Sequence, residues 1–122
     1  MEARALSQDF QPGDFLIFQL ESGYGLMRLL SIDEQDGDRV WHVAAYGDLF
    51  LDPDSADAAI THPESLEINH PHLALTNRAF ESTPVARMGN APLSEGDLQR
   101  LNDINAQPEV SDRSIRLLLG LR

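Results

Sequence analysis

The stretch PGDFLIFQLESGYGLMRLL, residues 12–30, predicts a β-hairpin at the start of the fold. Gln11 to Asp14 contains the Pro-Gly pair of a turn, and residues 15–20 then read as a strand. That strand is apolar on both sides, so we expect it to be central in a sheet or covered on both faces. Residues 21–23 form a turn, and residues 24–32 read as the second strand.

A third strand is predicted over residues 39–46, after an acidic loop that contains the turn pair Asp36-Gly37. Alternation places Trp41 and Val43 on one face of it. In the second strand, alternation puts Ile32 on the same face as Arg28. Three short strands with tight connections predict an antiparallel meander.

The rest of the chain predicts shorter elements and two C-terminal helices. Ser94 and Asp97 resemble a capping box, so one helix is expected to begin at Ser94, and another is expected to begin at Ser111 and to end at Gly120. The remaining expectations are short strands at 58–60 and 66–68, a loop at 69–72, a helical turn within 73–80 that begins at Thr76, and an extended segment at 83–88. The predicted class is therefore α+β: an N-terminal antiparallel β-meander, forming an SH3-like partly open barrel, followed by short C-terminal helices.

Length and composition indicate one soluble domain. The 122 residues suit a single core, and we expect a loose N-terminal arm over residues 1–11 and one domain over residues 12–122. The chain has no cysteine, which excludes disulfides, thiolate zinc sites and thiol nucleophiles. No secretory signal and no apolar stretch of about 20 residues is present. The expected location is cytoplasmic, and no cofactor is expected.

The charge favours a protein partner. The net charge is −11, from 20 acidic residues and nine Arg. This field disfavours nucleic-acid backbones and anionic membranes, and it attracts basic proteins. Between residues 33 and 57 lie eight acidic residues and one Arg. The sequence predicts a partner-binding patch here, with steering carboxylates and aromatic anchors: Asp36, Asp38, Asp48, Asp52, Asp54, Tyr46 and Phe50.

Motifs for catalysis are absent from the sequence. There is no Gly-x-Ser-x-Gly elbow, no Walker loop and no dinucleotide fingerprint. The strongest alternative lies in His62, His70 and His72, because a His-x-His pair in an extended segment can bind zinc or copper. These histidines would serve a metal-dependent enzyme, or an enzyme that uses paired carboxylates.

The first hairpin resembles the opening of the immunity protein 26 family and of related bacterial small-barrel domains. The similarity lies in Gly13-Asp14 before an apolar strand, in Gly23-Tyr24-Gly25, and in Arg28 of the second strand. The closing region is similar at Leu73-Ala74-Leu75, Ala79-Phe80 and Pro92-Leu93-Ser94-Glu95. This resemblance implies a bacterial protein that binds and neutralises a cognate toxin in the producing cell.

Three functions therefore remain open. The first is a non-catalytic protein-binding module, an immunity protein against a basic toxin. The second is the enzyme that uses the region of His62, His70 and His72. The third is a subunit or accessory domain of a homo- or hetero-oligomer, whose sheet face pairs with another chain.

Overall fold

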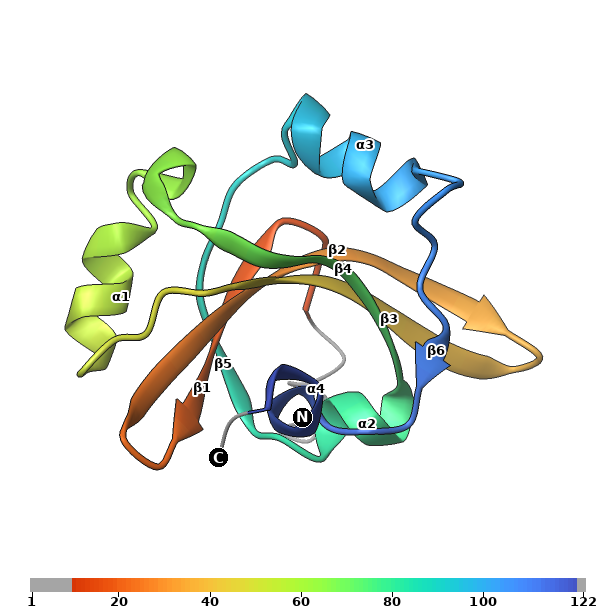
Figure 1. Ribbon diagram of the computed structural model, residues 1–122, viewed down its shortest axis with the longest axis horizontal. Coiled ribbons are helices and arrows are strands. Elements are labelled where there is room, and N and C mark those ends of the chain that lie inside the picture. Colours follow the sequence, from red (N-terminus) through yellow and green to blue (C-terminus); the bar gives the residue numbers. More distant parts are fainter. Residues whose placement is uncertain (1–9, 121–122) are drawn as a thin grey trace, which may run out of the picture.

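The computed structural model describes residues 10–120, which form an α+β fold around one six-stranded sheet (Figure 1). The strand order is β5-β1-β2-β3-β4-β6. The strands are β1 (Asp14–Leu20), β2 (Gly23–Gln35), β3 (Asp38–Tyr46), β4 (Ile68–Thr76), β5 (Val85–Asn90) and β6 (Val110–Ser111). Strands β1 to β3 form the predicted antiparallel meander and β4 continues it, while β5 pairs antiparallel with β1 and β6 pairs parallel with β4.

Short helices connect and cover the strands. They are α1 (Pro53–Ala59), the 3₁₀ helix η2 (Pro63–Ser65), α2 (Asn77–Glu81), α3 (Glu95–Asn102) and α4 (Ile115–Leu119). The sheet curves around α2 and α4, and α1 and α3 lie on its other side (Figure 1). The sheet is not closed, since β5 and β6 are its two edges, so the predicted barrel is not confirmed.

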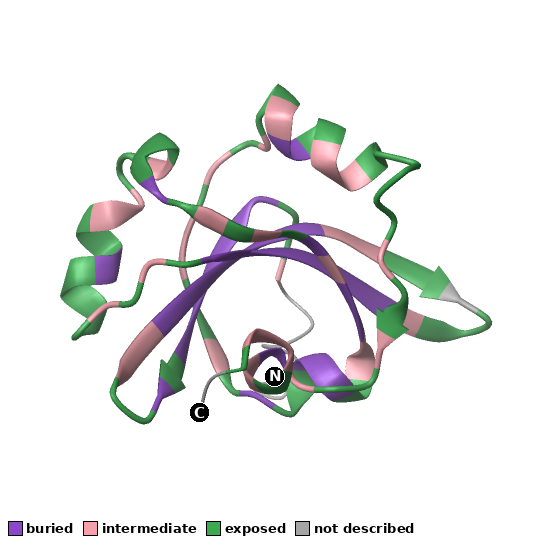
Figure 2. Ribbon diagram, viewed as in Figure 1, coloured by how far each residue is buried: buried purple, intermediate pink, exposed green. Residues whose placement is uncertain are grey.

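Apolar side chains fill both faces of the sheet, as the unbroken apolar run of β1 predicts (Figure 2). The core on the side of α2 and α4 contains Leu16, Phe18, Leu20, Met27, Leu29, Trp41, Val43, Leu75, Ala79, Phe80 and Ile115. The core on the side of α1 contains Phe15, Ile17, Leu26, Tyr46, Ala56 and Leu66. In the first core the rings of Trp41 and Phe80 stack at 3.9 Å.

The predicted N-terminal arm lies mostly outside the described residues, which begin at Phe10. The ring of Phe10 makes edge contacts with Trp41 and with Phe80, at centroid distances of 6.4 and 6.1 Å. This residue therefore packs against the core. No helix among residues 10–120 has the length and apolar character that crossing a bilayer would need.

A β-bulge in β2 reverses the predicted alternation. Leu29 pairs with Val43 but Ser31 pairs with His42, so Leu30 is the extra residue between them. Beyond it, Ile32 packs on the core of Trp41 and not on the face of Arg28. The prediction for Ile32 was wrong because one inserted residue moves every later side chain to the opposite face.

The middle of the chain differs from the prediction in several places. Residues 69–72, expected as a loop, and residues 73–75, expected in a helical turn, belong to β4. Residues 58–60, expected as a strand, end α1 and enter a turn, and of the strand expected at 66–68 only Ile68 lies in a strand. Strand β4 contains Pro71, and a strand tolerates proline where no neighbour needs its N–H. Strand β6 pairs only with Ala74 and Leu75, which leaves Pro71 on the unpaired edge.

The caps of the C-terminal helices are partly as predicted. Helix α3 has the full capping box: Ser94 Oγ accepts from the N–H of Asp97, and an oxygen of Asp97 accepts from the N–H of Ser94. Helix α4 is capped by Ser114 and not by Ser111, which lies in β6. Gly120 ends α4 with φ of 71°, as predicted for a helix C-terminus.

Candidate functional site

The predicted acidic patch is split between the two ends of β3. Asp36 and Asp38 lie at the β2–β3 hairpin, whereas Asp48, Asp52 and Asp54 follow the other end of the strand (Figure 1). At about 3.3 Å per residue, the eight steps along β3 separate the groups by roughly 26 Å. One continuous patch of these five aspartates therefore does not exist.

At the β2–β3 hairpin, arginine side chains lie close to the aspartates and offset their negative charge. A cavity of about 460 Å³ there is lined by Asp36, Asp38 and Asp112, but also by Arg39 and Arg78. Asp112 forms an exposed ion pair with Arg78, and the pKa of Asp112 is lowered chiefly by the hydrogen bond from that guanidinium. This end of the molecule therefore has a mixed charge.

The two predicted anchors belong to the core. Tyr46 is only 6% exposed and stacks on Phe15, and burial raises the pKa of its phenol. Phe50 is half-buried against the same cluster, and its backbone pairs with Tyr24. The large apolar side chains that do reach the surface in this segment are Leu49, 56% exposed, and Leu51, 86% exposed.

The segment that follows β3 is strongly acidic. Residues 47–67 contain six carboxylates and no Lys or Arg. We call this region, together with Leu49 and Leu51, the α1 surface. Its carboxylates are Asp48, Asp52, Asp54, Asp57, Glu64 and Glu67.

Hydrogen bonds hold the α1 surface in one conformation. Asp48 Oδ1 accepts from the N–H of Glu67 at 2.8 Å, and the N–H of Gly47 donates to the carbonyl of Glu67 at 2.7 Å. Asp52 caps α1 by accepting from the backbone N–H and the hydroxyl of Ser55, both at 2.8 Å. These two bonds lower the pKa of Asp52, so its charge is retained.

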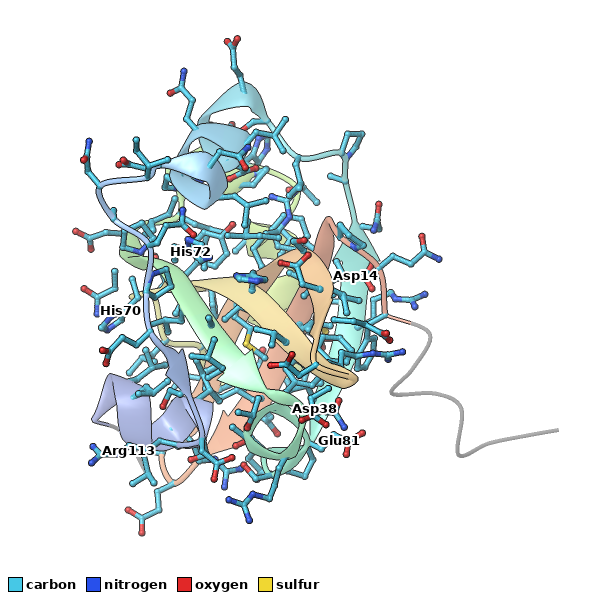
Figure 3. The ribbon with its side chains drawn as sticks, turned by 90° about the vertical axis from the view of Figure 1, so that its right-hand side faces the viewer. Asp14, Asp38, His70, His72, Glu81 and Arg113 are labelled. Atoms are coloured by element: carbon cyan, nitrogen blue, oxygen red, sulfur yellow. The ribbon has the colours of Figure 1, made fainter. Side chains whose placement is uncertain are left out.

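The three predicted histidines are not brought together. His62 is exposed beside Glu64, at 3.6 Å, while His70 and His72 both lie on β4 (Figure 3). Among residues 10–120, no three His, Asp or Glu side chains form a group that could hold a metal ion. The geometry therefore gives the metal alternative no support.

His72 instead contacts a histidine that the sequence analysis did not single out. His42 Nδ1 lies 2.8 Å from His72 Nε2, and His42 Nε2 lies 2.9 Å from an oxygen of Asp33. Both rings are only 8% exposed. They line a cavity of about 370 Å³, which we call the histidine cavity, with Ser31, Asp33, Leu101, Asn102, Ile104 and Gln107.

The bulge at Leu30 explains why the pattern did not reveal this cluster. Simple alternation places Ser31 and Asp33 on the face of Met27, away from His42. The inserted residue turns both to the face of His42. No local signal in the sequence marks the bulge, so the contact between Asp33 and His42 could not be predicted from the alternation of residues along the strand.

A second polar cluster joins the sheet to the segment before α3. Arg28 is buried, and its guanidinium donates to the carbonyls of Gly13, Ala91 and Pro92 at 3.0, 2.7 and 3.2 Å. Its Nη1 lies 3.7 Å from Asp97, which also binds Arg100. Because Arg28 donates to three backbone carbonyls, we assign this cluster a structural role.

Comparison with known proteins adds no relative: no protein-family model, no curated protein and no solved structure matches this chain. The resemblance to the immunity protein 26 family therefore stays a prediction.

Proposed function

We propose that this protein is a non-catalytic binding module that recognises a basic protein through the α1 surface. The observation that carries the proposal is the combination of six carboxylates, in a segment that contains no Lys or Arg, with two exposed leucines on the same hydrogen-bonded segment. The carboxylates would guide a basic partner to this face, and the leucines would be buried on contact.

The electrostatics favour this surface over the hairpin end. Long-range attraction depends on the summed field, and Arg39 and Arg78 reduce the field near Asp36 and Asp38. Residues 47–67 contain six carboxylates and no Lys or Arg, and of the six only Glu64 lines a cavity together with Arg28 and Arg100. Asp48, Asp52 and Asp54 therefore remain proposed partner contacts, while Asp36 and Asp38 do not belong to this surface.

The apolar contacts fall to Leu49 and Leu51, in place of Tyr46 and Phe50. A binding anchor must lose exposed area when the partner arrives. Tyr46 has almost none to lose, whereas most of Leu51 is accessible. The hydrogen bonds of Asp48 and Asp52 order the loop before binding, which lowers the entropic cost of association.

The resemblance of the first hairpin supplies the partner class. An immunity protein needs a steering surface and a few anchors, and it needs no catalytic constellation. A basic bacterial toxin is therefore the partner that we propose, in the cytoplasm of the cell that produces it.

The test compares two charge-reversal variants with the same change in net charge. One reverses the α1 surface with Asp54→Arg, Asp57→Arg and Glu67→Arg. The matched control reverses three exposed carboxylates elsewhere: Glu34→Arg, Asp38→Arg and Glu109→Arg. A basic partner would be captured from host lysate at low salt, purified, and its association rate measured with each variant.

We expect the α1 variant to slow association about tenfold or more and the control to slow it much less, given that steering changes rates by about 10–1,000-fold. Leu49→Ala with Leu51→Ala should raise the dissociation rate and leave the association rate nearly unchanged. Equal slowing by both charge variants would show that net charge acts without a defined surface, and would refute the proposal.

A further inference from the structure

The histidine cavity lies apart from the α1 surface, under α3. In Figure 3, His72 lies on β4 below that helix. The cavity is lined from β2, β3 and β4 on one side and from residues 101–107 on the other. Two buried ring nitrogens in it lack a well-aligned hydrogen bond within the described residues: His42 Nε2, although an oxygen of Asp33 lies 2.9 Å away, and His72 Nδ1. Buried polar atoms are rarely left unpaired, so these atoms require an explanation.

Counting ring protons supplies one. A neutral imidazole carries one N–H and one lone pair, and a cationic imidazole carries two N–H groups. The contact between His42 Nδ1 and His72 Nε2 needs one proton between the two atoms. With both rings neutral, a single further proton is available for the two outer nitrogens, and one of them stays unpaired.

Uptake of one proton by the two rings gives both outer nitrogens an N–H group. With three ring protons, one lies between the rings, one faces Asp33 from His42 Nε2, and one faces outward from His72 Nδ1. In this state the N–H on His42 Nε2 faces a carboxylate oxygen of Asp33 at 2.9 Å. The Arg100 carbonyl favours protonation of His72, although its geometry falls short of a hydrogen bond.

Uptake of a second proton breaks the contact. With both rings cationic, two N–H groups would face each other across 2.8 Å, and two like charges would lie in a buried site. The pKa of His72 is accordingly lowered, first by burial and then by the charge on His42. Of the described residues that line the cavity, Asp33 is the sole carboxylate and none is Lys or Arg. Arg100 of α3 pairs with Asp97 through Nη2, and its Nε is buried without a hydrogen-bond partner within the described residues.

Helix α3 has little else to hold it on the sheet. None of its described residues belongs to either hydrophobic core, and its Leu98 is 43% exposed. Its contacts with the sheet include the ion pair of Asp97 with Arg28 and those around the histidine cavity. An element with few buried apolar contacts opens locally at low free-energy cost.

We infer that His42 and His72 form a proton-operated latch, which keeps α3 on the sheet while the rings share a proton and releases it when both rings are cationic. Because the lowered pKa belongs to His72, the stabilisation is complete above the ordinary histidine value of about 6.5 and is lost as pH falls below it. Acidification is thus the signal, and loosening of α3 is the response.

The test is amide hydrogen exchange, read by mass spectrometry at about pH 7.5 and about pH 5 and corrected for the intrinsic pH dependence of exchange. We expect protection of the α3 amides to fall about tenfold at the lower pH, because α3 then opens locally more often. The protection of β1 should change much less.

The decisive variant is His72→Gln, and the matched control is His70→Gln, two residues away on the same strand. His72→Gln should abolish the pH dependence in α3, and His70→Gln should retain it. Unchanged α3 protection in the wild-type protein, or equal behaviour of the two variants, would overturn the latch. If His72→Gln fails to fold, NMR titration of the ring protons in the wild-type protein replaces it. One ring that titrates well below the ordinary histidine pKa supports the latch. Independent titration of both rings near the ordinary histidine pKa overturns the latch.

Discussion

At the scale of the residue, Arg28 has the largest structural role among the charged side chains. Its aliphatic stem starts in the middle of the sheet, and its guanidinium lies 4.2 Å over the ring of Phe15. The planar fork reaches three carbonyls and approaches Asp97, which a lysine could not reproduce. Arg28 therefore connects β2 to the residue before β1 and to the segment that follows β5.

Replacing Arg28 should be costly. We expect Arg28→Met to lower the free energy of unfolding by about 3 kcal/mol, because it leaves buried carbonyls without their donor and removes one partner of Asp97. Urea denaturation at neutral pH measures this change. The control is Arg113→Met, whose side chain is exposed. A loss below about 1 kcal/mol, within the range of ordinary surface changes, would contradict this role.

At the scale of the element, α3 is short and depends on its cap. Eight residues form a marginal helix in isolation, so the reciprocal bonds of Ser94 and Asp97 matter to its stability. Asp97 serves both this cap and the contact with Arg28. Loss of the cap should therefore weaken the attachment of α3 as well as the helix itself.

We expect Ser94→Ala to lower the local stability of α3 by about 1 kcal/mol, which is about a fivefold loss of amide protection. Hydrogen exchange by mass spectrometry resolves this change from that of β1, where little effect is expected. Ser22→Ala, at the exposed β1–β2 turn, is the control. A uniform loss of protection in α3 and β1 would show that α3 unfolds only with the whole domain.

At the scale of the whole molecule, the net charge of −11 lowers the stability of the folded state through repulsion between like charges. Like charges on one surface repel, and salt screens that repulsion over about 10 Å at moderate ionic strength. We expect this repulsion to be large on the α1 surface, because residues 47–67 contain six carboxylates and no Lys or Arg. The feature proposed for binding should therefore be a local source of instability in the free protein.

Thermal unfolding at increasing sodium chloride concentration tests this expectation. The wild-type Tm should rise with salt, and it should rise less in the variant with Asp54→Arg, Asp57→Arg and Glu67→Arg, because less repulsion remains to be screened. Calorimetry of both proteins gives the comparison. Parallel salt dependences would indicate that repulsion on the α1 surface makes no measurable contribution.

Much of the sheet was predictable because its signals are local. The strands of the meander, the turn at Gly37 and the box of Ser94 and Asp97 each depend on residues close in sequence. Alternation and turn chemistry suffice for such elements. The site was less predictable, because the split of the acidic residues depends on the length and direction of β3.

The sequence alone determined the class, the meander and the acidic, cysteine-free surface, since composition and period are properties of the chain itself. Only the tertiary structure decided that Pro71 lies in β4, that Tyr46 is buried, and that the sheet stays open. It also brought together Asp33, His42 and His72 across three strands. These features depend on bulges in the strand pairing and on contacts between distant segments, which exist only after folding.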